Sequence, residues 1–387
     1  MRRPMIAFSL ALASVLAAPS PAQTGTVDAK RPMTFEDMMQ MKRLGEMSVS
    51  PDSKWLAYTV TTVNLERNTK TPELRYQFLA GGESKPFPVG QPGDHDPQFA
   101  PDGKHILFLS GRSGSEQVWV AEFNDFNGEM SNPKKLTSIS TEADNAIWSP
   151  DSRAIVFTSS VYPDCQAITT ADAATGNKCN ADRDAALASS AVKAQIFTHL
   201  LYRHWDHYTG AKRSHLFLVS VESGAMRDLT PQDPRDVPPF SLEGGGCGCA
   251  FAPDSKELAF TENLDEEPAT SVNADIFTLN LADPAAKPVK VSTSAGGDFN
   301  PAYSPDGSYL AWRSQARASY ESDRLRLVLY DRKAKRIKDL LPATLDNWVE
   351  EFAWTPDSKN LLFTEGKKGE TPVFITNLSG VYHEFAN

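Results

Sequence analysis

The chain has 387 residues, with 39 Lys and Arg against 49 Asp and Glu, which gives a formal net charge of −10. The basic residues are scattered along the chain. This composition argues against a nucleic-acid partner, because nucleic-acid-binding proteins carry basic patches. An acidic surface is compatible with cationic or amine-bearing ligands, but it also serves solubility alone.

Residues 1–22 have the features of a secretory signal peptide. Arg2 and Arg3 supply the charged start, Met5–Ala18 is apolar but too short to span a bilayer, and residues 20–22 form a small-x-small cleavage site. No later stretch is apolar enough to span a membrane. We therefore expect a cleaved leader and a periplasmic or secreted protein.

A short pattern built around Pro-Asp occurs six times after this leader. Each copy has an apolar residue, a small residue, Pro-Asp, then Ser or Gly and an apolar run. Four of the five steps between copies are 49 to 52 residues long. A period near fifty that is built from short strands indicates β-propeller blades. The six prolines are Pro51, Pro101, Pro150, Pro253, Pro305 and Pro356.

Ser-Pro-Asp-Gly favours a type I turn, because proline presets φ at the second position while Ser and Gly suit the first and fourth. Apolar runs such as Ile106–Leu109 follow the turns, and a second hairpin ends in a motif such as Leu136-Thr137. Two hairpins per repeat make four strands. We predict an all-β fold, a β-propeller of about six visible four-stranded blades.

The signal peptide and the positions of the repeats predict the domain organisation. Residues 23–46 form an N-terminal segment with a short helix predicted over Phe35–Leu44, residues 47–380 form the propeller, and residues 381–387 form a C-terminal tail. The last repeat has no clear Leu-Thr strand, so the ring either closes on six blades or is incomplete. An incomplete ring would expose strand edges.

The step from Pro150 to Pro253 is 103 residues long, about twice the usual period. Residues 155–160 supply a first hairpin, and its matching second half appears only at 215–230. We therefore predict a third blade with an insertion at about 163–213, and not an additional blade. Asp182–His199 is rich in alanine and is predicted to be helical within this insertion.

Four cysteines fit an oxidising compartment. Cys165 and Cys179 lie 14 residues apart in the insertion and are candidates for a disulfide. Cys247 and Cys249 lie in a glycine-rich stretch, where a disulfide, two free thiols or half of a metal site are open alternatives. The sequence leaves three pairings open.

The His204-Trp205-Asp206 segment suggests a cavity lining, because His and Trp side chains can line one; local anchoring is the alternative. No Ser-His pair with an orienting acid can be assigned. The stretch Gly111–Ser115 imitates a nucleophile elbow, but it lacks the final glycine and lies between two predicted strands. We interpret it as a hairpin turn.

Several segments together resemble the propeller of S9 (prolyl oligopeptidase family) serine peptidases, in the dipeptidyl peptidase 5 and acylaminoacyl-peptidase-like branch. The resemblance covers about residues 33–378 and is most specific at Leu201–Asp206 with Lys212–Phe217. Ser314–Ala318 with Tyr320–Arg324 is nearly as specific.

The resemblance implies a division of labour. In that family the propeller restricts access to short peptides, and a following α/β-hydrolase domain with a Ser-Asp-His triad cleaves them. This sequence contains no Gly-x-Ser-x-Gly motif. We therefore expect the non-catalytic, substrate-gating propeller of a secreted peptidase, truncated before the hydrolase domain and inactive alone. Its expected partners are short peptides and a hydrolase domain or another protein; no cofactor or metal is expected.

Some members of the family hold the substrate's free amine with propeller carboxylates. Glu266 with Glu267, and Glu350 with Glu351, are the candidates here, because both pairs adjoin predicted strands where ligand-facing loops occur. A solvated acidic loop is the alternative for each pair.

A second hypothesis is a periplasmic protein-binding propeller similar to TolB, which uses the same Pro-Asp repeats without chemistry. The insertion that carries Cys165 and Cys179, and the segment from Leu201 to Phe217, favour the peptidase branch over this alternative.

Overall fold

The structure is a computed structural model that describes residues 31–165, 173–198, 200–204, 206–240 and 246–387. The predicted signal peptide lies outside the described residues. The chain divides into two units, residues 1–41 and 42–387. In the first, α1 (Phe35–Gln40) starts with a capping box between Thr34 and Asp37. No helix among the described residues is long and apolar enough to cross a membrane.

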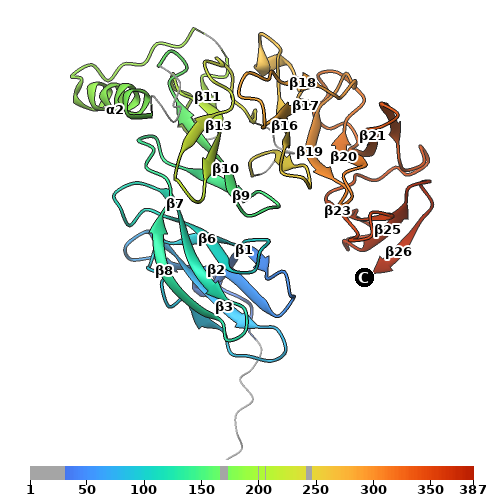
Figure 1. The fold of residues 1–387 in the computed structure, drawn as a ribbon, viewed down its shortest axis with the longest axis horizontal. Helices are drawn as coiled ribbons and strands as arrows, with labels where there is room; N and C mark the ends of the chain where they lie inside the picture. Colours follow the sequence, from blue (N-terminus) through green and yellow to red (C-terminus); the bar gives the residue numbers. More distant parts are fainter. Residues whose placement is uncertain (1–30, 166–172, 199, 205, 241–245) are drawn as a thin grey trace, which may run out of the picture. The chain divides into compact units, whose positions relative to one another are not determined.

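The second unit contains six four-stranded antiparallel sheets in its described part (Figure 1). In all six the strands lie in chain order, although β11 (Arg203–His204) and β12 (His207–Tyr208) intervene in sequence between two strands of the third sheet. The strands of the first three sheets are β1 (Arg43–Val49), β2 (Trp55–Asn64), β3 (Thr69–Phe78) and β4 (Lys85–Pro86); β5 (His95–Phe99), β6 (His105–Ser110), β7 (Gln117–Asn124) and β8 (Glu129–Lys135); β9 (Asp144–Trp148), β10 (Ala154–Val161), β13 (Arg213–Ser220) and β14 (Met226–Asp228).

The other three sheets repeat this plan with shorter strands. A 3-10 helix, η1 (Pro268–Thr270), precedes β17. The strands are β15 (Cys249–Phe251), β16 (Glu257–Glu262), β17 (Asp275–Asn280) and β18 (Val289–Lys290); β19 (Asp298–Tyr303), β20 (Tyr309–Ser314), β21 (Arg326–Asp331) and β22 (Arg336–Asp339); β23 (Phe352–Trp354), β24 (Asn360–Thr364), β25 (Val373–Asn377) and β26 (Tyr382–Ala386).

Apolar cores lie between successive sheets. Phe157 and Phe217 of the third sheet stack at 5.4 Å between ring centroids and belong to a cluster that includes Leu107 and Leu109 of the second sheet. Four further clusters join neighbouring sheets in the same way. Strands buried on both faces explain the apolar runs of the sequence. The predicted propeller of six four-stranded blades is confirmed.

The Pro-Asp turns have the predicted geometry. In each of the six, the N–H of the fourth residue donates to the carbonyl of the first, at 2.8–3.0 Å. The Asp carboxylate accepts the N–H two residues further on in every copy, at 2.8–3.2 Å. The fourth residue has a φ of 59–71°, in the left-handed region that favours glycine. Four of the six copies nevertheless have Ser there.

A hydrogen bond between sheets accompanies serine at this position. The N–H of Asp102 donates to Ser152 Oγ of the next turn at 3.0 Å, and Asp151 donates likewise to Ser255 at 3.1 Å. Asp306 and Ser358 repeat the contact at 2.9 Å. A hydrogen bond thus connects the strained serine to the turn of the preceding repeat.

The long third repeat is one sheet with an insertion, as predicted. β10 pairs with β13 over eight consecutive residues, although residues 162–212 separate them. Within the insertion lie α2 (Ala173–Ser189) and a ribbon of β11 (Arg203–His204) with β12 (His207–Tyr208). The predicted helix at 182–199 was wrong in its bounds: alanine content suggested its position, whereas tertiary contacts hold an earlier segment.

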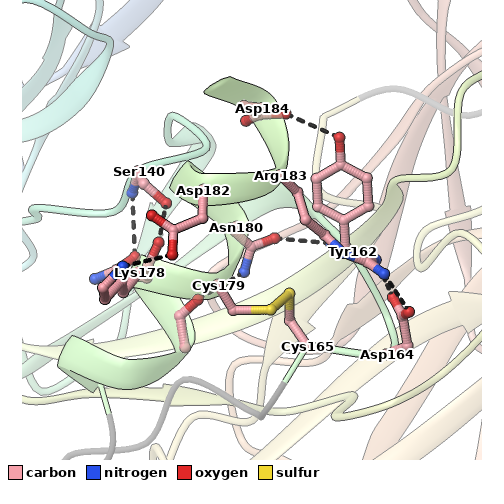
Figure 2. The surroundings of a disulfide bond; sticks show 12 residues. Ser140, Tyr162, Asp164, Cys165, Lys178, Cys179, Asn180, Asp182, Arg183 and Asp184 are labelled. Atoms are coloured by element: carbon pink, nitrogen blue, oxygen red, sulfur yellow. Dashed lines mark hydrogen bonds and ion pairs between the residues drawn. A yellow bond between two sulfur atoms is a disulfide. The ribbon is translucent and has the colours of Figure 1, made fainter. Parts of the chain in front are cut away.

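A disulfide between Cys165 and Cys179 attaches α2 to the segment that follows β10 (Figure 2). The backbone N–H of Tyr162 donates to Asn180 Oδ1 at 2.8 Å, and the Tyr162 hydroxyl donates to Asp184 at 3.0 Å. These contacts fix the helix at positions that composition does not reveal.

Three boundaries differ from the sequence-based limits. Residues 381–387 are not a free tail, because β26 pairs with β25 and completes the sixth sheet. The first sheet begins at Arg43 and not at 47, which ends the predicted helix at Gln40. Cys247 and Cys249, whose pairing was open, form a disulfide with each other.

Two serine-to-glycine substitutions test the link between sheets. Ser53→Gly removes left-handed strain of roughly 1–2 kcal/mol at the first turn, which no earlier repeat precedes. Because glycine's backbone entropy costs roughly 0.5–1 kcal/mol, the net stabilisation should be about 0.5–1 kcal/mol. Ser255→Gly removes similar strain but loses the bond from Asp151, worth about 1 kcal/mol, so it should be neutral or destabilising. Urea denaturation measures both; equal effects would contradict the proposed role of the bond.

Removing the insertion disulfide should loosen α2 selectively. By the chain-entropy model a loop of this length contributes roughly 3 kcal/mol. The double substitution Cys165→Ala and Cys179→Ala should therefore raise amide exchange across α2, measured by mass spectrometry, while β10 and β13 keep their protection. Unchanged exchange in α2 would show that the polar contacts suffice.

Candidate functional site

Bulged first strands bring polar residues of neighbouring sheets together. β5 and β19 contain register shifts, and the bulge residues Asp96 and Asn300 have φ values of 57° and 54°. Asn145 of β9 has a φ of 51° at the corresponding position, three residues before Trp148, the aromatic residue of its turn. Asn and Asp tolerate this conformation better than other non-glycine residues. In these three repeats, the position holds a short polar side chain.

First strands of neighbouring sheets also contact each other: β1 with β5, β15 with β19, and β19 with β23. Contact between β1 and β5 places Glu46 of the first sheet near Asp96, and the two carboxylates repel. Asp144 of the third sheet repels Asp96 as well. Carboxylates from three sheets thus repel one another electrostatically.

We call Glu46, His95, Asp96, Glu116 and Asp144 the acidic cluster. His95 Nε2 lies 2.9 Å from Glu116 Oε2, and this hydrogen bond raises the pKa of the imidazole. Burial, with repulsion from Glu46 next in size, raises the pKa of Asp96 to about 6. The backbone N–H of Asp96 donates to Thr59 Oγ1 at 3.1 Å, which holds the bulge in place.

The chemistry of this cluster is that of a cation acceptor. It has four carboxylates and one imidazole, and carboxylates bind ammonium groups through charge-assisted hydrogen bonds. Among the described residues, no three His, Cys, Asp or Glu side chains are placed to hold a metal ion.

The predicted pair Glu266 and Glu267 lies in the loop before β17. Glu266 is exposed, whereas Glu267 is partly buried at the start of η1 and its Oε1 has no hydrogen-bond partner among the described residues. Their role in binding an amine stays a prediction.

The second predicted pair, Glu350 and Glu351, is exposed directly before β23. The carbonyl of Glu350 accepts from Arg313 Nη1 at 2.5 Å, and the N–H of Glu351 donates to Thr364 Oγ1 at 3.2 Å. Glu351 stands three residues before Trp354, so it shares the sequence position of Asp96. This pair belongs to a different sheet from Glu266 and Glu267.

The predicted cavity-lining segment lies in the ribbon of the insertion. His204 pairs with His207 in the backbone register of β11 and β12, and Asp206 is an exposed residue between them. Trp205 lies outside the described residues. The cavity role of His204, Trp205 and Asp206 stays a prediction.

Sequence reasoning missed the acidic cluster, although a signal for it exists. The third residue before the apolar residue of each turn is acidic, Asn or Gly in all six repeats. The residues are Glu46, Asp96, Asn145, Gly248, Asn300 and Glu351.

Known proteins resemble the chain in sequence and in fold. It is 28% identical over 389 residues to "Dipeptidyl-peptidase 5" of Porphyromonas gingivalis, covering 96% of this chain and 52% of the relative. It is 22% identical over 365 residues to "Dipeptidyl-peptidase 5" of Aspergillus fumigatus, covering 88% and 48%. No family model matches the chain.

The chain is therefore similar in sequence to proteins named dipeptidyl-peptidase 5. The resemblance inferred from the sequence is thereby confirmed. The chain spans about half the length of these curated relatives.

Solved structures agree on the fold. The acylaminoacyl peptidase of Pyrococcus horikoshii superposes with a TM-score of 0.60 at 14% identity, covering 90% of this chain and 47% of that one. The propeller domain of the Trilobed protease from Pyrococcus furiosus gives 0.54 at 15% identity, covering 90% and 84%. The chain therefore has a β-propeller fold.

The raised pKa of Asp96 predicts how the stability of the fold changes with pH. A carboxyl whose pKa is higher in the folded than in the unfolded chain destabilises the fold as pH rises from about 4 through 6. Asp96→Asn removes this effect and keeps a side chain that two other repeats use at the same position. The melting temperature of the variant should exceed that of the parent by on the order of 2 °C at pH 8 and match it at pH 4.

Thr71→Ser, an exposed substitution in β3 that changes no charge, is the control and should show no pH-dependent difference. A gain for Asp96→Asn that is equal at both pH values would refute the electrostatic explanation.

Proposed function

We propose that this chain is the non-catalytic, substrate-gating propeller of an exported S9-type exopeptidase that acts on short peptides. The observation that carries the proposal is the match to about half of each dipeptidyl-peptidase 5 relative, combined with a propeller fold. In this proposal, a hydrolase domain supplies the chemistry and the propeller selects what reaches it. Export rests on the charged and apolar start of the sequence.

The sequence supports a non-catalytic role for the propeller. The nearest imitation of a nucleophile elbow, Gly111–Ser115, forms a turn between β6 and β7, in which Gly114 N–H donates to Gly111 O at 3.0 Å. Ser115 Oγ accepts from Gln117 Nε2 at 3.0 Å. A nucleophile elbow instead requires a strand, a sharp turn and a helix.

The acidic cluster gives the proposed gate a means of selecting peptides. A peptide α-amine has a pKa near 8 and is largely protonated at neutral pH. Asp96, with a pKa of about 6, is largely ionised there, and Glu46, Asp144 and Glu116 repel it. An ammonium group in the cluster would relieve their mutual repulsion. We therefore assign free peptide N-termini to this cluster.

Calorimetry with two tripeptides tests the assignment. The purified chain should bind Ala-Ala-Ala more tightly than N-acetyl-Ala-Ala-Ala, because the acetyl group removes the positive charge. Asp96→Asn should weaken binding of the free tripeptide at least about tenfold, since a hydrogen bond to a charged group is worth about 1.5–3 kcal/mol. Asp283→Asn, an exposed substitution after β17, should leave affinity unchanged.

Two results would contradict the proposal. Equal binding of the free and acetylated tripeptides would remove the amine from the assignment. Hydrolysis of dipeptidyl-arylamides by the chain alone, with activity that follows the protein through purification, would show that it is not merely a gate.

A further inference from the structure

Two buried aspartates occupy the same place in two different repeats. Asp94 and Asp298 each stand five residues before the aromatic residue of their Pro-Asp turn. Asp94 is 1% exposed to solvent and Asp298 is 0% exposed. A buried carboxylate is unfavourable unless a cation or hydrogen bonds compensate its charge. The two repeats differ in how they do this.

In the second sheet, an arginine compensates the charge. Arg112 follows β6, its Nη2 pairs with Asp94 Oδ2, and its Nε donates to Ser110 Oγ at 2.9 Å. The backbone N–H of Gln91 also donates to Asp94 Oδ2, at 2.7 Å. Asp94 is therefore an ion-paired and hydrogen-bonded carboxylate.

In the fifth sheet, no arginine stands at the sequence position of Arg112, although Arg326 Nη2 of β21 donates to Ser314 Oγ at 3.0 Å. β20 matches β6 residue for residue, so that Ser314 corresponds to Ser110 and Ala316 to Arg112. Asp298 Oδ1 accepts from Trp312 Nε1 at 2.8 Å, but Asp298 Oδ2 has no hydrogen-bond partner among the described residues. The methyl group of Ala316 cannot replace a guanidinium.

A cavity of about 340 Å³ lies at this position, and both Asp298 and Ala316 line it. Its apolar wall is formed by Ala295, Trp312, Val328 and Ile337. The polar remainder of the wall includes Thr293, Ser294, Ser314, Arg326 and Asp339.

The other charged groups around the cavity already have partners. Arg326 Nη1 lies 2.8 Å from both carboxylate oxygens of Asp339, and Lys290 Nζ lies 2.6 Å from Asp275 Oδ2. Burial raises the pKa of Asp298 to about 7, repulsion from Asp275 adds to the rise, and Ser314, Trp312 and Ser292 oppose it. Asp298 is thus the carboxylate left without a cation.

We propose that the Asp298 cavity binds a small primary alkylammonium ion. The ammonium group would take the place that the Arg112 guanidinium has beside Asp94 and donate to Asp298 Oδ2, while the alkyl chain packs against the apolar wall. A charge-assisted hydrogen bond inside a low-dielectric site favours the ionised pair. The site lies in another sheet from the acidic cluster and does not depend on the proposed peptidase role.

Titration with n-propylammonium chloride tests the proposal, with the Trp312 indole N–H as the probe. Its ¹H–¹⁵N NMR signal is assigned by its loss in Trp312→Phe. We expect a saturable shift at pH 8 that weakens at pH 6, where Asp298 takes up a proton. Neutral n-propanol and sodium chloride at the same concentrations should give no saturable shift.

Three variants complete the test. Asp298→Asn keeps an acceptor for Trp312 but lacks the charge, so it should weaken propylammonium binding at least about tenfold. Ala316→Arg should supply the guanidinium of the second sheet, abolish the shift and raise the melting temperature. Asp346→Asn, an exposed substitution away from the cavity, is the control and should bind propylammonium as the parent does.

The proposal is overturned if the parent chain shows no saturable shift, if n-propanol produces the same shift, or if Asp298→Asn binds propylammonium as tightly as the parent. If the tripeptides do not bind the chain but propylammonium still shifts the Trp312 indole signal, only the proposed peptidase role is rejected. The proposed alkylammonium site then stands.

Discussion

The Asp carboxylate of the Pro-Asp turn is the interaction on which the rest of this fold depends. In all six repeats it accepts the N–H two residues further on, so the chain reverses at the same point and starts the next strand in the same register. Where the following residue is Ser152, Ser255 or Ser358, a second bond connects the turn to the preceding one. One local motif therefore sets both the hairpin and the spacing of successive sheets.

Regular repeats make departures from the pattern informative. The same sequence position holds Asp96 in one sheet and Asn145 or Asn300 in others, and only the carboxylate repels its acidic neighbours. Likewise, Asp94 and Asp298 share a position, but one has Arg112 and the other faces a cavity beside Ala316. A scaffold that repeats its geometry can vary its chemistry one side chain at a time.

Local signals explain what the sequence could predict. The turns, the strands after them and the insertion in the third repeat are each encoded within a few residues, so they were predicted correctly. β26 was missed because its Tyr382–Ala386 segment is mostly exposed and lacks the Leu-Thr ending. The helix of the insertion was misplaced because Cys179 and Asn180 hold it through tertiary contacts. The acidic cluster and the Asp298 cavity require residues from several strands, which no local pattern reports.

The gating role could be tested most directly by reading the genomic sequence immediately downstream of the Asn387 codon. The account predicts an open reading frame for an α/β-hydrolase domain, either continuous with this chain or beside it, with a Gly-x-Ser-x-Gly motif followed by Asp and His. A downstream region without such a frame would contradict the peptidase account and leave a propeller that acts alone.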